Sequence, residues 1–289
     1  MMENSLWMAF LNLLMEQIWA IIFFFAAGIS LARGRYKKTA VWLLGMGSAY
    51  VVNMSGFLSP ILKPVQAGSI TDISVVSVSV RSSNPQVGML LAEMLKGGYD
   101  IVAVQELQDQ KLMLDVLKNY PGYFCYYQPG KSTVVLSRFP AVESIHLKNV
   151  QRVTLQIDPD NTLQVYNLHA PKYSSNLALY NKFFAGVFQS IENNQQGKIV
   201  IAGDFNSTQN NYWRGKLPSL NFSSALHDAG SGWLATFPTK YRSYGFLFPF
   251  VSIDDIYVKN MKLISGDVLG KYYGSDHHPV HAMLRTKLD

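Results

Sequence analysis

A run of 24 residues without a charged side chain, Thr39–Leu62, restricts what this chain can form more than any other feature. At a rise of 1.5 Å per residue, a helix of this length crosses a hydrocarbon core of about 30 Å. The preceding run, Leu6–Ala32, is also long and apolar, although Asn12, Glu16 and Gln17 interrupt it. We therefore predict two transmembrane helices, at residues 6–32 and 39–62. An interfacial amphipathic helix followed by a single span is the alternative.

The charges between the two runs predict their orientation. The segment Arg33-Gly34-Arg35-Tyr36-Lys37-Lys38 carries four positive charges, and such loops stay in the cytoplasm. Both chain ends then lie outside, which predicts a multi-pass protein of the cell (inner) membrane with a periplasmic or otherwise extracytoplasmic domain. If the first run does not span, the domain lies on the other side. Only 15% of the residues are charged, against about 25% in soluble domains, which agrees with a membrane part.

The composition excludes several classes of protein. With 48% hydrophobic residues, the chain is not intrinsically disordered. A single cysteine, Cys125, excludes a disulfide framework and a multi-cysteine zinc site. The formal net charge of +6 permits a polyanionic partner without requiring one.

Residues 66–289 are predicted to form one α/β domain, after a membrane anchor at residues 1–65. Three helices are predicted, from Asn84-Pro85 to Gly97-Gly98, over Asp109–Asn119 and over Asn176–Glu192. Mixed strands and helices of this kind favour two packed sheets with helices outside. The predicted strands are Ile73–Val80, Ile101–Gln105, Thr133–Ser137, Val153–Ile157, Leu163–Leu168, Lys198–Ala202, Ile253–Val258 and Pro279–Leu284.

Polar side chains follow several of these strands. Asp204 and Asn206 come after an apolar strand and a glycine, and a carboxylate beside an amide suits activating a water and holding a phosphoryl oxygen. An ordinary Gly-Asp turn is the alternative. Glu106 ends another apolar strand, where it is either a magnesium ligand or a solvated strand end. His169 ends a third strand, where a single histidine is usually structural.

The C-terminal part adds further candidates. Asp254 and Asp255 lie in one strand and point to opposite faces, so at most one of them joins a given site. Asp276 and His277 stand just before the last strand, where they offer a metal ligand and a general acid or base. The oxygen-rich set favours Mg²⁺, or Mn²⁺, over zinc, because no HExxH or CxxC motif is present. The set fits metal-assisted phosphoester hydrolysis.

The motifs resemble the endonuclease/exonuclease/phosphatase superfamily, which has the DNase I-like fold. They occur in family order as VQEL (Val104–Leu107), LSRFP (Leu136–Pro140), NLHAP (Asn167–Pro171), AGDFNST (Ala202–Thr208), IDDI (Ile253–Ile256) and SDHHPV (Ser275–Val280). With its N-terminal runs, the chain resembles a membrane-anchored bacterial subgroup. The resemblance implies a four-layered α/β sandwich, with two packed mixed sheets flanked by helices and the site at one end of the sheets.

The resemblance also implies roles for single residues. Glu106 would bind the divalent metal, with Asp276 at the same metal site. Asp204 would orient or deprotonate the attacking water, and Asn206 would hold that water or the phosphate. The remaining implied roles concern histidines: His277 would pair with Asp254 and contact the scissile phosphate, His169 would contact phosphate or assist the leaving group, and His278 has no role.

One position departs from the family pattern. The family usually has an asparagine at the end of the first strand, where this chain has Ser79. Asn84 matches a second, weaker asparagine of the membrane-anchored subgroup. Serine is shorter and offers a hydroxyl in place of an amide, so phosphate or metal positioning at Ser79 would be weaker.

The substrate is predicted less sharply. Basic residues near expected loops either contact a phosphate backbone or are solvated surface residues, the interpretation favoured for most of them: Lys131, Arg138, Lys172, Arg214, Lys216, Lys240 and Arg242. The aromatic segment Tyr241–Phe250 could stack on bases, enter a bilayer or pack in the core. We predict a membrane-anchored, magnesium-dependent phosphodiesterase, a nuclease that hydrolyses DNA or RNA, whose partners are nucleic acid and the lipid bilayer. A lipid or headgroup phosphodiesterase of the sphingomyelinase type, and a weakened domain that binds phosphorylated ligands, are the alternatives.

Overall fold

The computed structural model describes residues 22, 24–44, 72–147, 149–194, 197–241 and 249–286. Before residue 72 it describes two helical stretches, at residues 24–32 and 36–44, joined by a turn in which the Arg35 amide donates to the Ser30 carbonyl. Within the described residues, no helix has both the length and the apolar character that a membrane crossing requires. The predicted spans at residues 6–32 and 39–62 lie largely outside the described residues.

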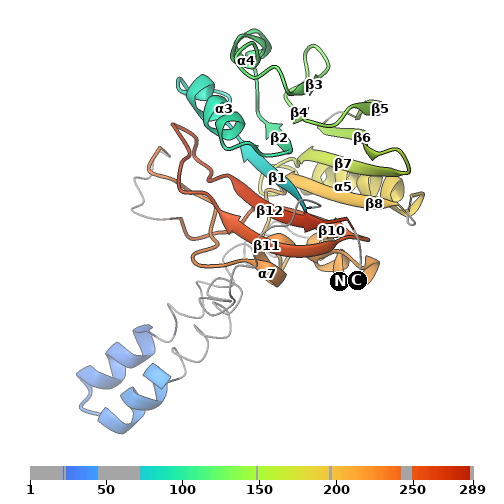
Figure 1. Ribbon diagram of the computed structural model, residues 1–289. Helices are drawn as coiled ribbons and strands as arrows, with labels where there is room; N and C mark the ends of the chain where they lie inside the picture. The colour runs from blue at the N-terminus through green and yellow to red at the C-terminus, as the bar shows by residue number, and fades with distance from the viewer. Residues whose placement is uncertain are drawn as a thin grey trace.

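Two mixed sheets of six strands each form the body of the domain (Figure 1). In the first sheet the order is β11 (Lys262–Val268), β12 (Val280–Arg285), β1 (Asp72–Ser79), β2 (Ile101–Gln105), β4 (Val134–Ser137) and β3 (Phe124–Tyr126). In the second it is β5 (Ala141–Leu147), β6 (Val150–Asp158), β7 (Asn161–His169), β8 (Lys198–Asp204), β10 (Asp254–Lys259) and β9 (Ser223–Ser224). The β1–β2 and β7–β8 pairs are parallel and the other pairs are antiparallel.

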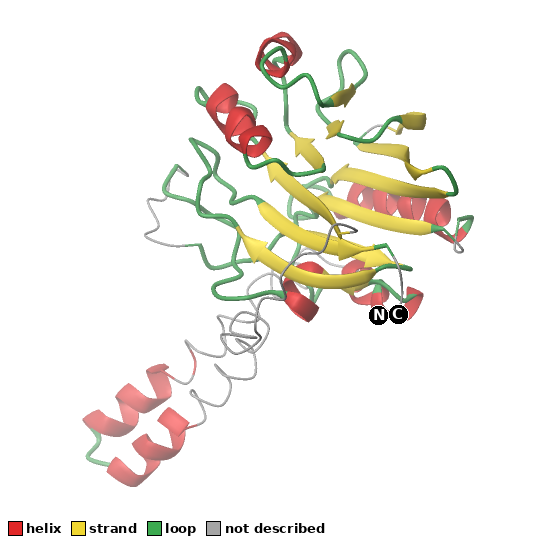
Figure 2. Cartoon of the chain, viewed as in Figure 1, coloured by secondary structure: helices red, strands yellow, loops and turns green. Residues whose placement is uncertain are grey.

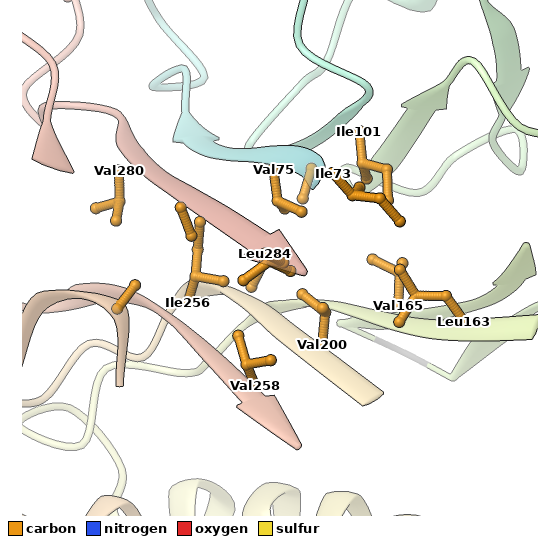
Figure 3. Close-up of a cluster of buried hydrophobic side chains, with 14 of the residues drawn as sticks. Ile73, Val75, Ile101, Leu163, Val165, Val200, Ile256, Val258, Val280 and Leu284 are labelled. Atoms are coloured by element: carbon orange, nitrogen blue, oxygen red, sulfur yellow. The ribbon is translucent and has the colours of Figure 1, made fainter. Parts of the chain in front are cut away.

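Helices flank the two sheets on their outer faces (Figure 2). One hydrophobic cluster joins the first sheet to α3 (Val87–Lys96) and α4 (Gln110–Leu117), and another joins the second sheet to α5 (Leu177–Glu192) and α6 (Tyr212–Lys216). The largest cluster lies between the sheets, as Figure 3 shows. The shorter helices are η1 (Pro218–Leu220) and α7 (Ala225–Ala229). These layers confirm the predicted two-sheet, DNase I-like architecture.

Alternation along the central strands explains how the layers form. In β1, Ile73 and Val75 face the second sheet, whereas Val76 and Val78 face the helices. Successive side chains of a strand point to opposite faces, so an apolar run without polar gaps fits a strand that is covered on both sides. The last inward position of β1 is Ser79, which therefore lies at the end of the space between the sheets.

The predicted helices are confirmed, with one difference at a helix start. α4 and α5 begin directly after Asp109 and Asn176, the first residues of the predicted ranges. Both residues are helix caps, because their side chains accept from backbone amides three residues later. α3 begins at Val87 and not at the predicted Asn84-Pro85. The Asn84 side chain instead accepts a hydrogen bond from the Gln86 amide at 2.8 Å and closes a turn before the helix. Such local bonds compete with helix formation.

A close approach of two backbones makes Gly203 a sensitive position in β8. A Cβ placed there would lie 1.9 Å from the Leu168 carbonyl oxygen of β7, and its φ of +153° is rare for other residues. We expect Gly203→Ala to lower the free energy of unfolding by about 3 kcal/mol, because the parallel pair must separate next to Asp204. Denaturant unfolding measures this effect. Gly122→Ala is the control, since no atom lies within 4 Å of its Cβ position; equal losses in both variants would contradict the explanation.

Candidate active site

Strand register brings the predicted polar residues to one end of the sheets. In the second sheet, His169 of β7 pairs with Asp204 of β8, and Asp254 of β10 pairs with the same Asp204 from the other side. Glu106 directly follows β2 in the first sheet, and His277 precedes β12. Five residues from distant parts of the sequence therefore meet because their strands end at the same edge.

A buried trio forms the centre of this site. Asp254 accepts hydrogen bonds from Nδ1 of His277, at 2.8 Å to Oδ2 and 3.1 Å to Oδ1. On the other side of the ring, Nε2 of His277 lies 4.0 Å from Oδ2 of Asp204. The His277 backbone is also held, because its amide donates to the Ser275 hydroxyl, which donates to the Ser79 carbonyl. The ring is thus fixed with Nε2 toward Asp204 and the cavity.

The environment favours a charged imidazole at His277. Burial disfavours the charged form, but the carboxylates of Asp254 and Asp204 outweigh it and raise the pKa of His277 to about 10. Burial raises the pKa of Asp204 to about 8, even though the positive charge of His277 acts in the opposite direction. At neutral pH, His277 therefore carries a proton that it can donate to an anion.

A second group of possible ligands adjoins the trio. Nε2 of His169 lies 3.5 Å from Oε1 of Glu106 and 3.8 Å from Oδ2 of Asp204. Burial lowers the pKa of His169, although the Glu106 charge opposes this, so the imidazole is neutral at pH 7 and has a lone pair to offer. Ligand atoms of Glu106, His169 and Asp204 all lie within 4.8 Å of one another. These three residues could hold a metal ion.

The two predicted metal ligands share one cavity. This cavity has a volume of about 360 Å³, and Glu106 and Asp276 both line it. Asp204, Asn206 and His277 line the same cavity. Asp254 lies behind His277 and is not among the lining residues, so it can act only through the ring that it holds.

Asn206 holds Asp204 in place. Its backbone amide donates to Oδ1 of Asp204 at 2.7 Å, and its side-chain amide donates to Oδ2 at 3.1 Å and to the Ala170 carbonyl at 2.8 Å. A left-handed φ of +48° at Asn206, a conformation that asparagine tolerates, lets the chain fold back over the carboxylate. The Asp204 carboxylate is therefore fixed before any substrate binds.

The two weaker candidates have different surroundings. Ser79 is buried, and its hydroxyl has no hydrogen-bond partner among the described residues. The Asn84 amide donates to the carbonyls of Val80 and Tyr273, and its oxygen accepts from Gln86. In this structure Asn84 thus secures the loop after β1, and its predicted contact with phosphate stays a prediction.

The structure also changes the set of basic candidates. Arg214 is buried and paired with Asp255 at 2.7 Å, on the face of β10 opposite to Asp254, so its predicted contact with a phosphate backbone is wrong. Lys172 lines the cavity, as does Arg81, which sequence reasoning missed because it follows β1 outside every motif. The other predicted cations, Lys131, Arg138, Lys216 and Lys240, do not line it. Arg242 and most of the aromatic segment Tyr241–Phe250 lie outside the described residues.

A buried polar bridge under the site was also missed. Nε2 of Gln105 in the first sheet donates to Oδ1 of Asn167 in the second sheet at 2.7 Å. The Asn167 amide donates in turn to the carbonyls of Val104 and Val134. Gln105 lies in the VQEL motif and Asn167 in the NLHAP motif. Membership in these motifs was the sequence signal that could have indicated the bridge. The bridge joins the strands that carry Glu106 and His169.

Substitution of Asp204 by asparagine should stabilise the metal-free protein at pH 8 but not at acid pH. A carboxyl group whose pKa is raised to about 8 binds a proton more tightly in the folded than in the unfolded chain. Its stabilising contribution is complete below the unfolded pKa near 4 and is lost as the pH rises through about 8. In metal-free buffer at pH 8, we expect Asp204→Asn to raise the melting temperature by about 2–4 °C, with little change at pH 4.5. Scanning calorimetry of both proteins at the two pH values tests this, and a variant destabilised at pH 8 would contradict it.

Comparisons with known proteins agree with this architecture. A family model described as Endonuclease/Exonuclease/phosphatase family matches residues 53–277. A comparison with curated proteins gives no significant match. Among solved structures, an endonuclease/exonuclease/phosphatase family protein from Bacteroides thetaiotaomicron has 18% sequence identity and a TM-score of 0.61, covering 75% of this chain and 99% of that one.

Two further solved structures have the same fold. The endonuclease/exonuclease/phosphatase from Bacteroides vulgatus has 16% identity and a TM-score of 0.61, covering 75% of this chain and 100% of that one. D. rerio TDP2, complexed with single strand DNA product, has 16% identity and a TM-score of 0.56, with the same coverage. At these identities the likeness concerns the fold, so the chemistry of this chain has to be argued from its own residues.

Proposed function

The chain belongs to the endonuclease/exonuclease/phosphatase family, and from this premise we propose that it is a membrane-anchored, divalent-metal-dependent phosphodiesterase that hydrolyses nucleic acid. One observation carries the chemistry: the buried trio of Asp254, His277 and Asp204 opens onto the same cavity as Glu106 and Asp276. A charged imidazole next to fixed carboxylates, with space for a ligand, suits attack by water on a phosphodiester.

The side chains around Glu106 fit a divalent metal such as Mg²⁺ or Mn²⁺. Glu106, His169 and Asp204 offer two carboxylates and a neutral imidazole within 4.8 Å, and Asp276 adds a carboxylate to the same cavity. Hard divalent ions prefer oxygen ligands and bind through few carboxylates, leaving other positions to water and phosphate. Such an ion would neutralise charge on the phosphate and lower the pKa of a bound water. Glu106 and Asp276 are the ligands that we propose, with His169 and Asp204 adjacent.

The other residues of the site act on the substrate through protons and hydrogen bonds. Asp254 orients His277, whose Nε2–H donates to a phosphate oxygen as negative charge builds up there. Asp204, held by Asn206, accepts a proton from the attacking water in its ionised form, which the positive charge of His277 favours and which a bound divalent ion would favour further. His169 contacts the phosphate or the leaving group from the opposite side of Asp204. Ser79 and Asn84 position the phosphate more weakly.

Nucleic acid is the substrate that the cavity favours. Arg81 and Lys172 line the cavity with the carboxylates and His277. Two such cations suit a substrate that has further phosphates on either side of the scissile phosphate. D. rerio TDP2, which shares the fold, is described in complex with single strand DNA product. A polynucleotide is a linear polyanion that would use these cations together with the reactive centre.

We also propose the domain division and the location that the sequence predicts. Residues 1–65 form the anchor and residues 66–289 form the catalytic domain. The uncharged run Thr39–Leu62 and the basic segment from Arg33 to Lys38 support two spans with a periplasmic or extracytoplasmic domain. Reporter fusions after residue 70 test this orientation, and a cytoplasmic signal would overturn it.

A substrate panel tests the proposed activity. The full chain in phosphatidylcholine nanodiscs is incubated with DNA, RNA, sphingomyelin and bis(p-nitrophenyl) phosphate, with Mg²⁺ or with EDTA. We expect the unchanged protein to cleave a nucleic acid in the presence of Mg²⁺ but not of EDTA. The Asp204→Asn variant should not cleave it. Cleavage of sphingomyelin alone would favour the lipid phosphodiesterase. Binding of phosphorylated ligands without any cleavage would favour a weakened domain. Ser79, which replaces the family's asparagine and whose hydroxyl has no hydrogen-bond partner among the described residues, is the basis for this alternative.

A further inference from the structure

A second cavity, of about 460 Å³, lies on the outer face of the second sheet. It is lined by α5 and by residues of β5, β6 and β7, and none of the proposed catalytic residues lines it. Its volume falls within the range of ligand sites, about 300–1,000 Å³. Most of its lining is apolar, including Val150, Tyr166 and Phe183. The volume and the lining together describe a binding cleft that the phosphodiesterase chemistry does not use.

The cleft is elongated along α5. Leu179, Phe183, Gly186 and Ser190 line it at helical spacing, so the cleft follows one face of the helix for about three turns. This face measures roughly 16 Å, which matches an extended acyl chain of about twelve carbons. A linear occupant therefore fits the cleft better than a compact ring system.

Gly186 keeps the middle of this cleft open. Glycine is disfavoured in the interior of a helix, so its presence in α5 calls for a reason. No atom lies within 4 Å of the position that a Cβ would take at Gly186, so packing against a neighbour does not require glycine there. The absent side chain leaves space that a ligand can occupy.

The polar residues of the cleft indicate the charge of the occupant. Lys182 is exposed on α5 and lines the cleft, and within the described part of the chain it makes no ion pair. Arg152 lines the cleft as well. Its guanidinium forms an ion pair with the half-exposed Glu143, at 2.8 Å from Nη2 to Oε2. An apolar groove with cations at its rim is complementary to a chain with an anionic head.

We propose that this cleft binds a free fatty acid, with the acyl chain along α5 and the carboxylate at Lys182. The aliphatic chain is removed from water against Val150, Phe183 and the open position of Gly186, and burial of each methylene group adds to the affinity. Affinity should thus rise with chain length, by roughly tenfold for two additional methylene groups, until the cleft is filled.

Photolabelling of the full chain in phosphatidylcholine nanodiscs tests the site. The probe is dodecanoate with a terminal diazirine, and labelled peptides are identified by mass spectrometry. We expect adducts between Leu179 and Ser190 that unlabelled dodecanoate displaces and that dodecanol displaces more weakly. Gly186→Phe should reduce labelling at least tenfold because the ring fills the cleft. Lys182→Gln should weaken competition by dodecanoate about two- to fivefold, as for an exposed ion pair.

A matched variant separates filling of the cleft from a general effect of an added ring. Gly122 also has no atom within 4 Å of its Cβ position and does not line the cleft, so Gly122→Phe should label like the unchanged protein. Thermal unfolding verifies that Gly186→Phe is folded. Labelling that persists in a folded Gly186→Phe variant, or equal competition by dodecanol, would overturn the proposal. Concentration-dependent self-association that Gly186→Phe abolishes would also overturn it, because a second copy would then fill the cleft.

Discussion

Replacement of His277 by alanine should lower phosphodiesterase turnover by about 10²–10⁴-fold, the range for a positioned acid or base. Asp254 holds Nδ1 at 2.8 Å, and the neighbouring carboxylates raise the pKa of the ring to about 10. The imidazolium thus donates from Nε2 to a phosphate oxygen throughout the neutral range. Alanine removes this donor, and the loss appears mainly in kcat because the bond strengthens in the transition state. Initial rates on the substrate found in the panel measure the effect.

The adjacent His278 provides the matched control. Its Nδ1 donates to the Leu269 carbonyl at 2.8 Å, its ring packs against Tyr272, and it does not line the catalytic cavity. We expect His278→Ala to retain activity within about threefold and to lose about 1 kcal/mol of stability from the missing hydrogen bond. Circular dichroism checks the folding of both variants. Equal activity of the two variants would mean that His277 is not the catalytic histidine or that the domain is not a catalyst.

Removal of the buried Arg214 should have the largest effect on stability. Its guanidinium pairs with Asp255 at 2.7 Å, and both side chains are only 2% exposed. It also donates to the Tyr257 hydroxyl and to the carbonyls of Ser207 and Ser252. Arg214→Met leaves a buried carboxylate without its partner, and such losses cost about 3–5 kcal/mol. We expect the melting temperature to fall by about 10 °C or more.

A double variant tests whether the unpaired charge causes this loss. Arg214→Met combined with Asp255→Leu removes both charges, and an apolar replacement of a buried pair is often tolerated, so most of the stability should return. Burial raises the pKa of Asp255 although Arg214 opposes it, so the defect of the single variant should grow as the pH rises from 5 to 8. A double variant that is no more stable than the single one would refute this explanation.

The sequence alone was sufficient for the interior strands and for most of the polar residues that the structure brings together at one end of the sheets. All eight predicted strands overlap inner strands of the two sheets, because strands covered on both sides appear as apolar runs. The four strands that were missed are β3, β5, β9 and β11, which are the edges of the two sheets. Edge strands are short or partly exposed, as in β5, and their mixed composition resembles that of loops.

The tertiary structure determined which side chains of the site contact one another, and therefore which role each of them can have. Alternation in β10 predicted that only one of Asp254 and Asp255 could join the site, and the family resemblance implied Asp254. The structure shows the contact itself, at 2.8 Å from Nδ1 of His277, and places Asp204 on the other side of the ring. Arg214 could be expected at the surface from its charge alone, yet it meets Asp255 in the core. Local periodicity determines which face a side chain takes, whereas pairing across the sheets determines which distant side chains it meets. That second step depends on contacts far apart in the chain, which residue patterns do not encode.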